Sequence, residues 1–275
     1  MDPSGDRPDL IASIPFFLVH AAALAAFFVP FEPWYVALAI GLYYVRMFGV
    51  TAGYHRYFSH RAFKTSRAFQ FALAFLAVSS AQKGVLWWAS HHREHHRTSD
   101  EPEDIHSPVR SGIWWAHAGW LLAPRNDGVD VERVTDLMRY PELRWLERWH
   151  FVPPAVLAAI LFFTGGLPVL IWGFFVSTTL LWHGTFTINS LAHVFGSRRY
   201  PTTDNSRNNW LLSLITLGEG WHNNHHFYQP AANQGFFWWE FDPTYYALRM
   251  LAWVGLIRDL RTPPPHVLKG SLHRT

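Results

Sequence analysis

The chain has 275 residues, of which 49% are hydrophobic and 17% aromatic, with 15 tryptophans, a composition too apolar for an ordinary soluble domain. It fits a membrane protein that carries Trp and Tyr at the membrane interfaces. The chain has no cysteine, which excludes disulfides, thiolate metal sites and a cysteine nucleophile, and its net charge of +3 comes without a basic tract that would favour nucleic-acid binding.

Four apolar stretches predict membrane-spanning helices in two hairpins. The first pair is residues 10–29 and 34–54, joined by a turn from Val29 to Pro33, and the second is residues 151–164 and 168–192, joined by a turn from Gly165 to Pro168. A helix rises about 1.5 Å per residue, so about 20 residues cross the hydrocarbon layer. Arg46, the one charge in the second span, could snorkel to the interface or face the bundle interior, and we expect it to snorkel.

The remaining segments, residues 55–150 and 193–262, are predicted to form a cytoplasmic helical cap. Residues 68–88 are also apolar, but we assign them to helices lying at the interface, because a crossing here would separate the histidine clusters described below. The external turns hold only Glu32, whereas Thr51 to His150 contain thirteen Lys and Arg, so both termini are expected in the cytoplasm. The sequence thus predicts an all-α, multi-pass integral membrane protein forming a single domain over residues 1–275.

Histidines gather in the cap and at the ends of the predicted spans. In the run Ser90 to His96, a helix would place His92, His95 and His96 on one face, so that three neutral nitrogens converge on one point. His91 shares a face with His95, which leaves the first ligand of this run open between His91 and His92. The same spacing recurs at His222, His225 and His226, and His193 follows Asn189 by one helical turn.

His55 and His60 form a further cluster, with five-residue spacing. This spacing places the two side chains about 140° apart on an ideal α-helix, so the helix is expected to end or turn between them. Nine clustered imidazoles are too many for one ion, because zinc takes four ligands and octahedral iron six. The sequence therefore predicts two metal ions held by nitrogen and oxygen ligands, although imidazole suits Zn, Cu, Fe and Ni alike.

The HxxxxH pattern and the two HxxHH patterns resemble the histidine boxes of the membrane fatty acid desaturases, closest to the acyl-CoA (stearoyl-CoA type) delta-9 desaturases. The resemblance extends from about Leu10 to Arg261. It implies two iron ions, with O2 as co-substrate, in the cytoplasmic cap. Carried over residue by residue, it implies as metal ligands His55, His60, His92, His95, His96, His193, His222, His225 and His226, with Asn189 acting through a water.

The activity implied by this resemblance is O2-dependent insertion of a cis double bond into a long-chain saturated acyl group, in that family at the delta-9 position of an acyl-CoA. Ser90 and His91 stand where the animal enzymes have an Arg-Asp pair that touches CoA, so CoA, acyl carrier protein and intact lipid all stay open as carriers. Asp100, Glu101 and Glu219 are expected to orient imidazole N–H groups.

Two further expectations concern electrons and substrate. The chain has no haem, flavin or nicotinamide motif, so electrons must come from a separate donor such as a ferredoxin, a rubredoxin or a cytochrome b5-like protein. A linear acyl chain needs a closed tunnel between the spanning helices. Tyr43 and Met47, at i and i+4 on the second span, are candidate substrate-binding residues at its floor.

Three other interpretations are weighed against this one. A carboxylate di-iron site would use Glu-x-x-His, which Glu147/His150 and Glu219/His222 match. A fatty acyl or alkyl hydroxylase or monooxygenase would share the histidine plan. A membrane metal transporter or sensor would need ligands along a path through the middle of the membrane, whereas these histidines cluster at helix ends and in polar segments.

Overall fold

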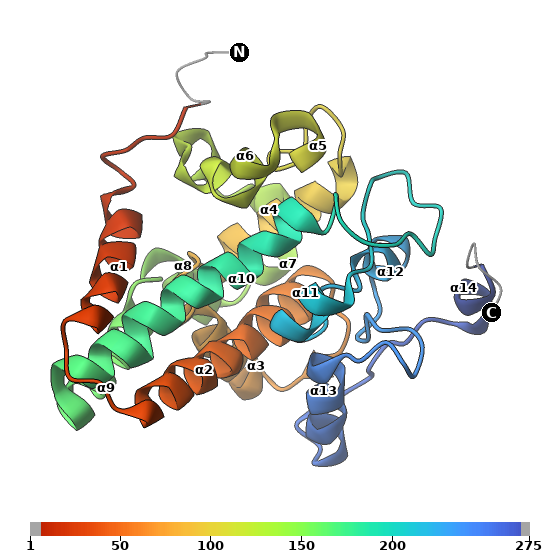
Figure 1. The fold of residues 1–275 in the computed structure, drawn as a ribbon. Helices are drawn as coiled ribbons and strands as arrows, with labels where there is room; N and C mark the ends of the chain where they lie inside the picture. Colours follow the sequence, from red (N-terminus) through yellow and green to blue (C-terminus); the bar gives the residue numbers. More distant parts are fainter. Residues whose placement is uncertain (1–6, 271–275) are drawn as a thin grey trace.

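The computed structural model describes residues 7–270, which are helical except for loops and two short strands (Figure 1). The strands β1 (Lys64–Thr65) and β2 (Ile257–Arg258) pair antiparallel. The prediction that both termini lie in the cytoplasm concerns residues 1–6 and 271–275, which lie outside this range.

The α-helices are α1 (Ile14–Leu24), α2 (Pro33–Phe48), α3 (Arg67–Val78), α4 (Val85–Thr98), α5 (Pro108–Ser111), α6 (Ile113–His117), α7 (Thr135–Met138), α8 (Pro141–Arg148), α9 (Val152–Leu170), α10 (Ser177–Leu191), α11 (Trp210–Ile215), α12 (His222–Phe227), α13 (Pro243–Trp253) and α14 (Pro265–Lys269). The 3₁₀ helices are η1 (Ala25–Phe27), η3 (Gly119–Leu122), η4 (Pro124–Asn126) and η5 (Val131–Val134), and the π-helices are η2 (Gly49–Ser59) and η6 (Ile171–Val176).

The second apolar stretch forms one continuous helix, in which α2 passes into the π-helix η2. The helix runs from Pro33 to Ser59, and its 27 residues give it ample length to cross a bilayer. Pro33 is tolerated at its start because the first turn of a helix needs no N–H donor there. The predicted span over residues 34–54 therefore continues to Ser59.

The third and fourth apolar stretches form a helical hairpin through α9, η6 and α10. Gly166 interrupts the helix with φ 68° and ψ −160°, a conformation that glycine adopts without a steric penalty. A Cβ added at Gly173 would lie 3.1 Å from Leu161 Cδ1, whereas twelve residues of straight helix would span about 18 Å. The chain therefore folds back at the turn predicted for residues 165–168.

Two helical segments of the described chain are long and apolar enough to cross a membrane, Pro33–Ser59 and Val152–Leu191, the second being the folded hairpin. The first apolar stretch gives a shorter apolar helix, Ile14–Phe27, and the side chains of α1 are not buried. The helix α3 has 12 residues, about 18 Å, which agrees with the prediction that residues 68–88 do not cross.

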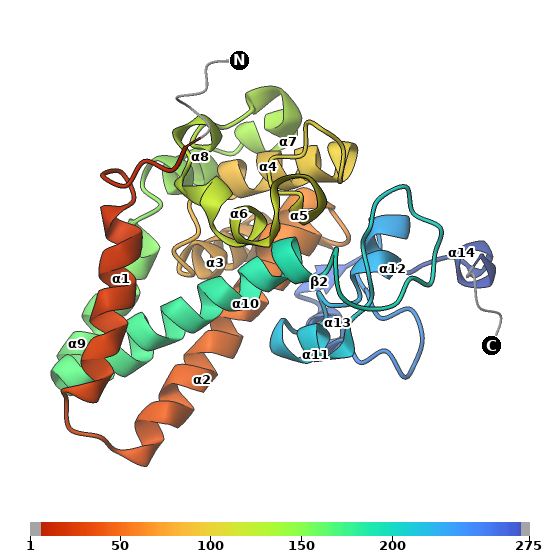
Figure 2. The same cartoon turned by 45° about the horizontal axis from the view of Figure 1, so that its top comes forward.

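Arg46 joins α2 to α10, which lie side by side in both views (Figures 1 and 2). Its side chain is 1% exposed, and its guanidinium donates to the hydroxyls of Ser177 and Thr178, the latter at 2.8 Å. It also donates to the carbonyl of Ser79 at 3.3 Å. The expectation that Arg46 snorkels to the interface is wrong, because acceptors inside the bundle satisfy its donors.

The π-helix η2 changes how His55 and His60 lie. The backbone N–H of His60 donates to the carbonyl of His55 at 3.2 Å, the i to i+5 bond of a π-helix. This wider winding brings residues five apart onto one side, and the two imidazole centroids lie 4.8 Å apart. The helix ends at Ser59, between the two histidines as expected, but the separation of about 140° on an α-helix does not apply to this π-helical segment.

The histidine-bearing segments gather at one end of the apolar helices. In both views α4, α11 and α12 surround the ends of α2 and α10 that lie far from the turn before Pro33 (Figures 1 and 2). The hydroxyl of Tyr43 on α2 donates to the carbonyl of Ile215 on α11 at 2.7 Å, so the spanning helices are bonded directly to this cap.

Candidate metal centre

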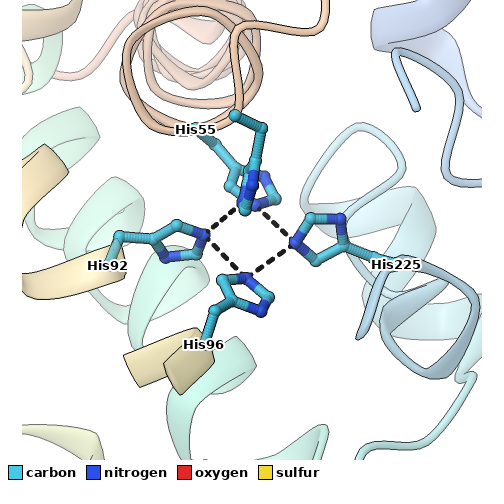
Figure 3. A group of neighbouring side chains, drawn as sticks. His55, His92, His96 and His225 are labelled. Atoms are coloured by element: carbon cyan, nitrogen blue, oxygen red, sulfur yellow. Dashed lines mark hydrogen bonds between the residues drawn. The ribbon is translucent and has the colours of Figure 1, made fainter. Parts of the chain in front are cut away.

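The nine predicted histidines come together in two groups at the junction of the apolar helices and the cap. Within each group one nitrogen of every imidazole lies within 4.8 Å of the others, and Figure 3 shows four members of the first group pointing toward one another. The five-histidine group contains His55, His60, His92, His96 and His225. The four-histidine group contains His95, His193, His222 and His226, all buried.

The nitrogens within each group are close enough to share a ligand. In the five-histidine group the Nε2 atoms of His55 and His225 lie 2.9 Å apart, and those of His60 and His92 2.8 Å apart. In the four-histidine group the Nε2 atoms of His193 and His222 lie 3.0 Å apart. The Nε2 of His226 is buried without a hydrogen-bond partner, although its Nδ1 is bonded. The lone pair of His226 Nε2 is therefore available to a metal ion. The two histidine groups thus suit a pair of metal ions bound by imidazoles.

The helices α4 and α12 each supply histidines to both groups. On α4, His92 and His96 are one turn apart and enter the five-histidine group, whereas His95 points to the four-histidine group. On α12, His225 enters the first group, while His222 and His226 enter the second. The expectation that each HxxHH pattern converges on one point is therefore wrong. The structure divides the nine histidines, a division that the sequence left open, into one group of five and one of four.

His91 belongs to neither group. Its Nδ1 donates to the carbonyl of Trp87 at 2.9 Å, and its ring faces the cavity described below. Of these two residues, His92 is therefore the one that belongs to a histidine group.

Carboxylates hold the far nitrogen of four of the imidazoles. His193 Nδ1 donates to Asp100 Oδ2 at 3.0 Å, and His55 Nδ1 donates to Glu219 Oε2. Both carboxylates were expected to orient imidazoles. Glu101 is exposed, and Asp104 bonds the Nδ1 of His95 instead, at 3.2 Å. Asp204, which sequence reasoning missed, accepts from His226 Nδ1 at 2.5 Å. Each bond fixes the tautomer that leaves Nε2 free for a metal.

Burial keeps most of these imidazoles neutral. It lowers the pKa of His92, His96, His222 and His225 well below the usual value, with neighbouring histidines adding to the effect, and it lowers the pKa of His226 to about 4. For Asp204, burial raises the pKa, but the bond from His226 and the bonds from Ser206 outweigh it and the pKa falls. The centre thus offers neutral nitrogens backed by ionised carboxylates, which is the protonation state that metal binding needs.

The two Glu-x-x-His matches do not form a carboxylate site. Glu147 accepts the backbone N–H groups of Leu86 and Trp87 at the start of α4, and His150 is exposed. Glu219 is bonded to Arg56 and His55. Neither carboxylate belongs to the two histidine groups, so the ferritin-like interpretation is contradicted.

An apolar cavity of about 450 Å³ reaches the metal centre. Its wall includes His92 and Asn189, the latter on α10 one turn before His193, and it continues past Trp88 and Thr185 to Phe16 and Trp182. A volume of this size, lined by one member of the five-histidine group, suits a flexible apolar chain.

Tyr43 and Met47 are absent from the part of the wall that the described residues form. Both are buried against Gly184, where an added Cβ would lie 2.5 Å from the Tyr43 hydroxyl and 3.1 Å from Met47 Cε. The stacked rings of Phe16 and Trp182, with centroids 5.3 Å apart, lie on the cavity wall instead.

Comparison with known proteins agrees with the histidine pattern and the fold. The fatty acid desaturase family model matches residues 31–255. The chain is 35% identical to an sn-2 palmitoyl-lipid 9-desaturase of Nostoc sp., over 98% of this chain and 95% of the relative. It is 36% identical to an sn-1 stearoyl-lipid 9-desaturase of Synechocystis sp., over 95% and 84%. It is 37% identical to an acyl-CoA C20 Delta5-desaturase of Anemone leveillei, over 79% and 70%. The chain therefore belongs to the fatty acid desaturase family.

Proposed function

We propose that this protein is an O2-dependent desaturase that introduces a cis double bond at the delta-9 position of a long-chain saturated acyl group. The observation that carries the proposal is the apolar cavity whose wall contains His92 of the five-histidine group and Asn189. The delta-9 position rests on the resemblance and on the names of two relatives, since a third is a Delta5 enzyme. Acyl-CoA was the carrier implied by the resemblance, and the relatives' names include both lipid and CoA enzymes.

The nine imidazoles would hold two iron ions, one in each group, with Asn189 contributing through a water. When bound, the irons would supply the O2 activation that an unactivated methylene requires, because no general base or nucleophile can remove its hydrogens. The protein itself would orient the imidazoles through four carboxylates, Asp100, Asp104, Asp204 and Glu219. Its cavity would confine the acyl chain so that one C–C bond lies beside His92.

The balance of the reaction calls for a separate electron donor. One O2, two hydrogens from the acyl chain, two electrons and two protons give the double bond and two waters. The sequence has no cysteine for an iron–sulfur cluster and no motif for a haem or a flavin. We therefore infer an external donor of the ferredoxin, rubredoxin or cytochrome b5 type. Turnover by the purified chain with NAD(P)H and O2 alone would contradict this.

The membrane arrangement that we propose has four spans in one domain, residues 1–275, with both termini and the metal centre in the cytoplasm. The apolar helix Ile14–Phe27, the helix Pro33–Ser59 and the two arms of the hairpin Val152–Leu191 would be the spans. The thirteen Lys and Arg between Thr51 and His150 support the orientation. Cysteines introduced singly into this cysteine-free chain test it, because only those on the cytoplasmic side should resist an impermeant thiol reagent in intact cells.

Expression in a host that makes no unsaturated fatty acids tests the activity. The proposal predicts cis-monounsaturated acids with the double bond at carbon 9. A fatty acyl or alkyl hydroxylase of the same histidine plan is the second candidate, and hydroxy acids as the main product would favour it. The His92→Ala variant is the matched negative control, since it removes one member of the five-histidine group and leaves the cavity open.

A further inference from the structure

A second space, a polar cleft of about 260 Å³, opens on the surface of the cap. Its walls come from the end of α4, the loop between α10 and α11, and the end of α12 with the residues after it, and in both views this loop lies beside α12 (Figures 1 and 2). Except for Pro201 and Phe227, every described residue of its wall is polar or charged. Among the described residues the polar cleft and the apolar cavity share no wall residue, so they are two separate spaces.

The wall of the polar cleft contains one histidine from each metal group. His96 belongs to the five-histidine group and His226 to the four-histidine group. The Nε2 of His226 is the buried nitrogen that has no hydrogen-bond partner. The described wall of the apolar cavity, by contrast, contains His92 of the five-histidine group and no member of the other group. The polar cleft is therefore the space that borders both groups.

The loop that forms one wall of the cleft is held in place by side-chain hydrogen bonds. The amide of Asn223 on α12 donates to the hydroxyl of Thr202 at 3.1 Å. Two residues further along, Asp204 accepts the Nδ1 proton of His226 at 2.5 Å. Asn223 and Asp204 are both buried. These bonds fix the residues on either side of Thr203, which is itself exposed at the mouth of the cleft.

The chemistry of the cleft suits water. At its mouth Arg97 and Glu101 are exposed and carry opposite charges, so neither sign of charge dominates there. The hydroxyls of Thr202 and Thr203 and the amide of Gln229 offer both donors and acceptors. A water molecule takes about 30 Å³ in the liquid, so the cleft has room for several.

The proposed reaction needs such a space in addition to the apolar cavity. Each turnover takes up two protons and releases two waters, as the balance of atoms requires. The acyl chain would fill the apolar cavity during this time. Water that passed through an apolar space would lose its hydrogen bonds, which is unfavourable. A polar passage on another side of the metal centre avoids this cost.

We propose that the polar cleft is the route by which water leaves the metal centre and protons reach it, while the acyl chain occupies the apolar cavity. This inference rests on the proposed function and assigns the cleft to the small polar reactants of that reaction. Waters held by the hydroxyls and amides of the wall would link the cap surface to His96 and His226, and protons would pass along their hydrogen bonds.

Azide tests which of the two spaces small polar solutes use. The purified protein with both irons ferric is mixed rapidly with sodium azide, and the visible absorption of iron-bound azide gives the association rate. No turnover occurs without an electron donor, so the measurement can be repeated with the apolar cavity filled by an acyl substrate. We expect the same association rate with and without the substrate. A rate that falls as the substrate binds would place the route in the apolar cavity and overturn the inference.

A pair of variants tests the cleft itself. Thr203→Trp places a large ring at its mouth, and Thr262→Trp places the same ring on an exposed residue outside its wall. We expect Thr203→Trp to slow azide association by about tenfold or more. Azide dissociation should slow by the same factor, because a narrowed passage changes both rates and leaves the Kd unchanged. Thr262→Trp should stay within about twofold of the unmodified protein.

Two results with these variants would contradict the inference. The first is an equal association rate in Thr203→Trp and Thr262→Trp. The second is a changed Kd at an unchanged association rate, which would mean an altered metal site rather than a closed route. Equal iron content shows that both variants fold. If Thr203→Trp loses its iron, the measurement with and without acyl substrate still decides the matter on the unmodified protein.

Failure of this inference differs from failure of the proposed function. If the host makes no unsaturated acid and the purified protein shows no iron-bound azide, the function itself is wrong and the inference falls with it. If the host makes unsaturated acids but azide passes through the apolar cavity, the function stands and the polar cleft is refuted as the route.

Discussion

Replacing Asp204 by Asn tests how carboxylates hold the imidazoles for the metals. Asp204 Oδ2 accepts the Nδ1 proton of His226 at 2.5 Å, while Oδ1 accepts the backbone N–H of Ser206 at 2.9 Å. Asparagine keeps the shape but removes the charge, so the Nε2 of His226 becomes a poorer ligand. Partners of this kind contribute about 10- to 100-fold in metal affinity, which equals about 1.4 to 2.7 kcal/mol.

The effect should be confined to one metal, because His226 belongs to the four-histidine group. Titration of the iron-loaded variant with a chelator should release its first iron at a chelator concentration about 10- to 100-fold below that needed for the unmodified protein. The second iron should leave at the usual concentration, with a plateau near one iron per chain. Glu101→Gln, which removes an exposed carboxylate, is the control. Release of both irons together, or release unchanged from the unmodified protein, would refute the reasoning.

Three further predictions follow from the site. His92→Ala should abolish activity and His91→Ala should leave part of it, because only His92 lies in a histidine group. The reverse ranking in a product assay would mean that His91, and not His92, is the metal ligand. Trp182→Ala should shift products toward longer acids, since Trp182 lines the cavity and Tyr43 and Met47 do not. If only Tyr43→Ala or Met47→Ala changed the length of the product acids, the closed end of the acyl site would lie on α2 instead. In the folded protein the pKa of His226 is lowered from the usual 6.5 to about 4, so the unfolded chain takes up the proton first as the pH falls. The metal-free protein should therefore lose up to about 3 kcal/mol of its free energy of unfolding between these two pH values. A melting temperature that rises on acidification would contradict this.

The histidine set could be predicted from the sequence because its spacing is local. Positions i, i+3 and i+4 lie near one another on a helix whatever the rest of the chain does. Asp100 and Glu219 were expected to orient imidazole N–H groups, but which imidazole each one holds, His193 and His55 respectively, follows only from the fold. Asp204 lies 22 residues from His226 and could be found only in three dimensions.

The geometry of the centre could not be predicted, for two physical reasons. Residues one turn apart, such as His92 and His96, share a direction, but His95 is rotated from them, and only the positions of α10 and α12 decide that it meets His193. The π-helix η2 has no marker in the sequence, yet it brings His60 beside His55. A close fit among several helices determines both features, as it does the burial of Arg46 against Ser177 and Thr178.

The cavity is also a tertiary feature. Its wall combines α1, α4, α10 and the start of α9. The sequence suggested a tunnel along the second span, because that helix leads into His55. The side chains of Tyr43 and Met47 fill the space against Gly184 instead, and the open volume lies on the side of α10 that faces α1.

The most direct test of a two-metal centre is the iron content of active protein, measured together with its specific activity after purification with the metal retained. Two separate groups of imidazoles predict about two irons per chain, with activity rising only as the second site fills. Zinc can replace iron on overexpression, so both metals should be counted in the same sample. Full activity at one metal per chain would contradict the account.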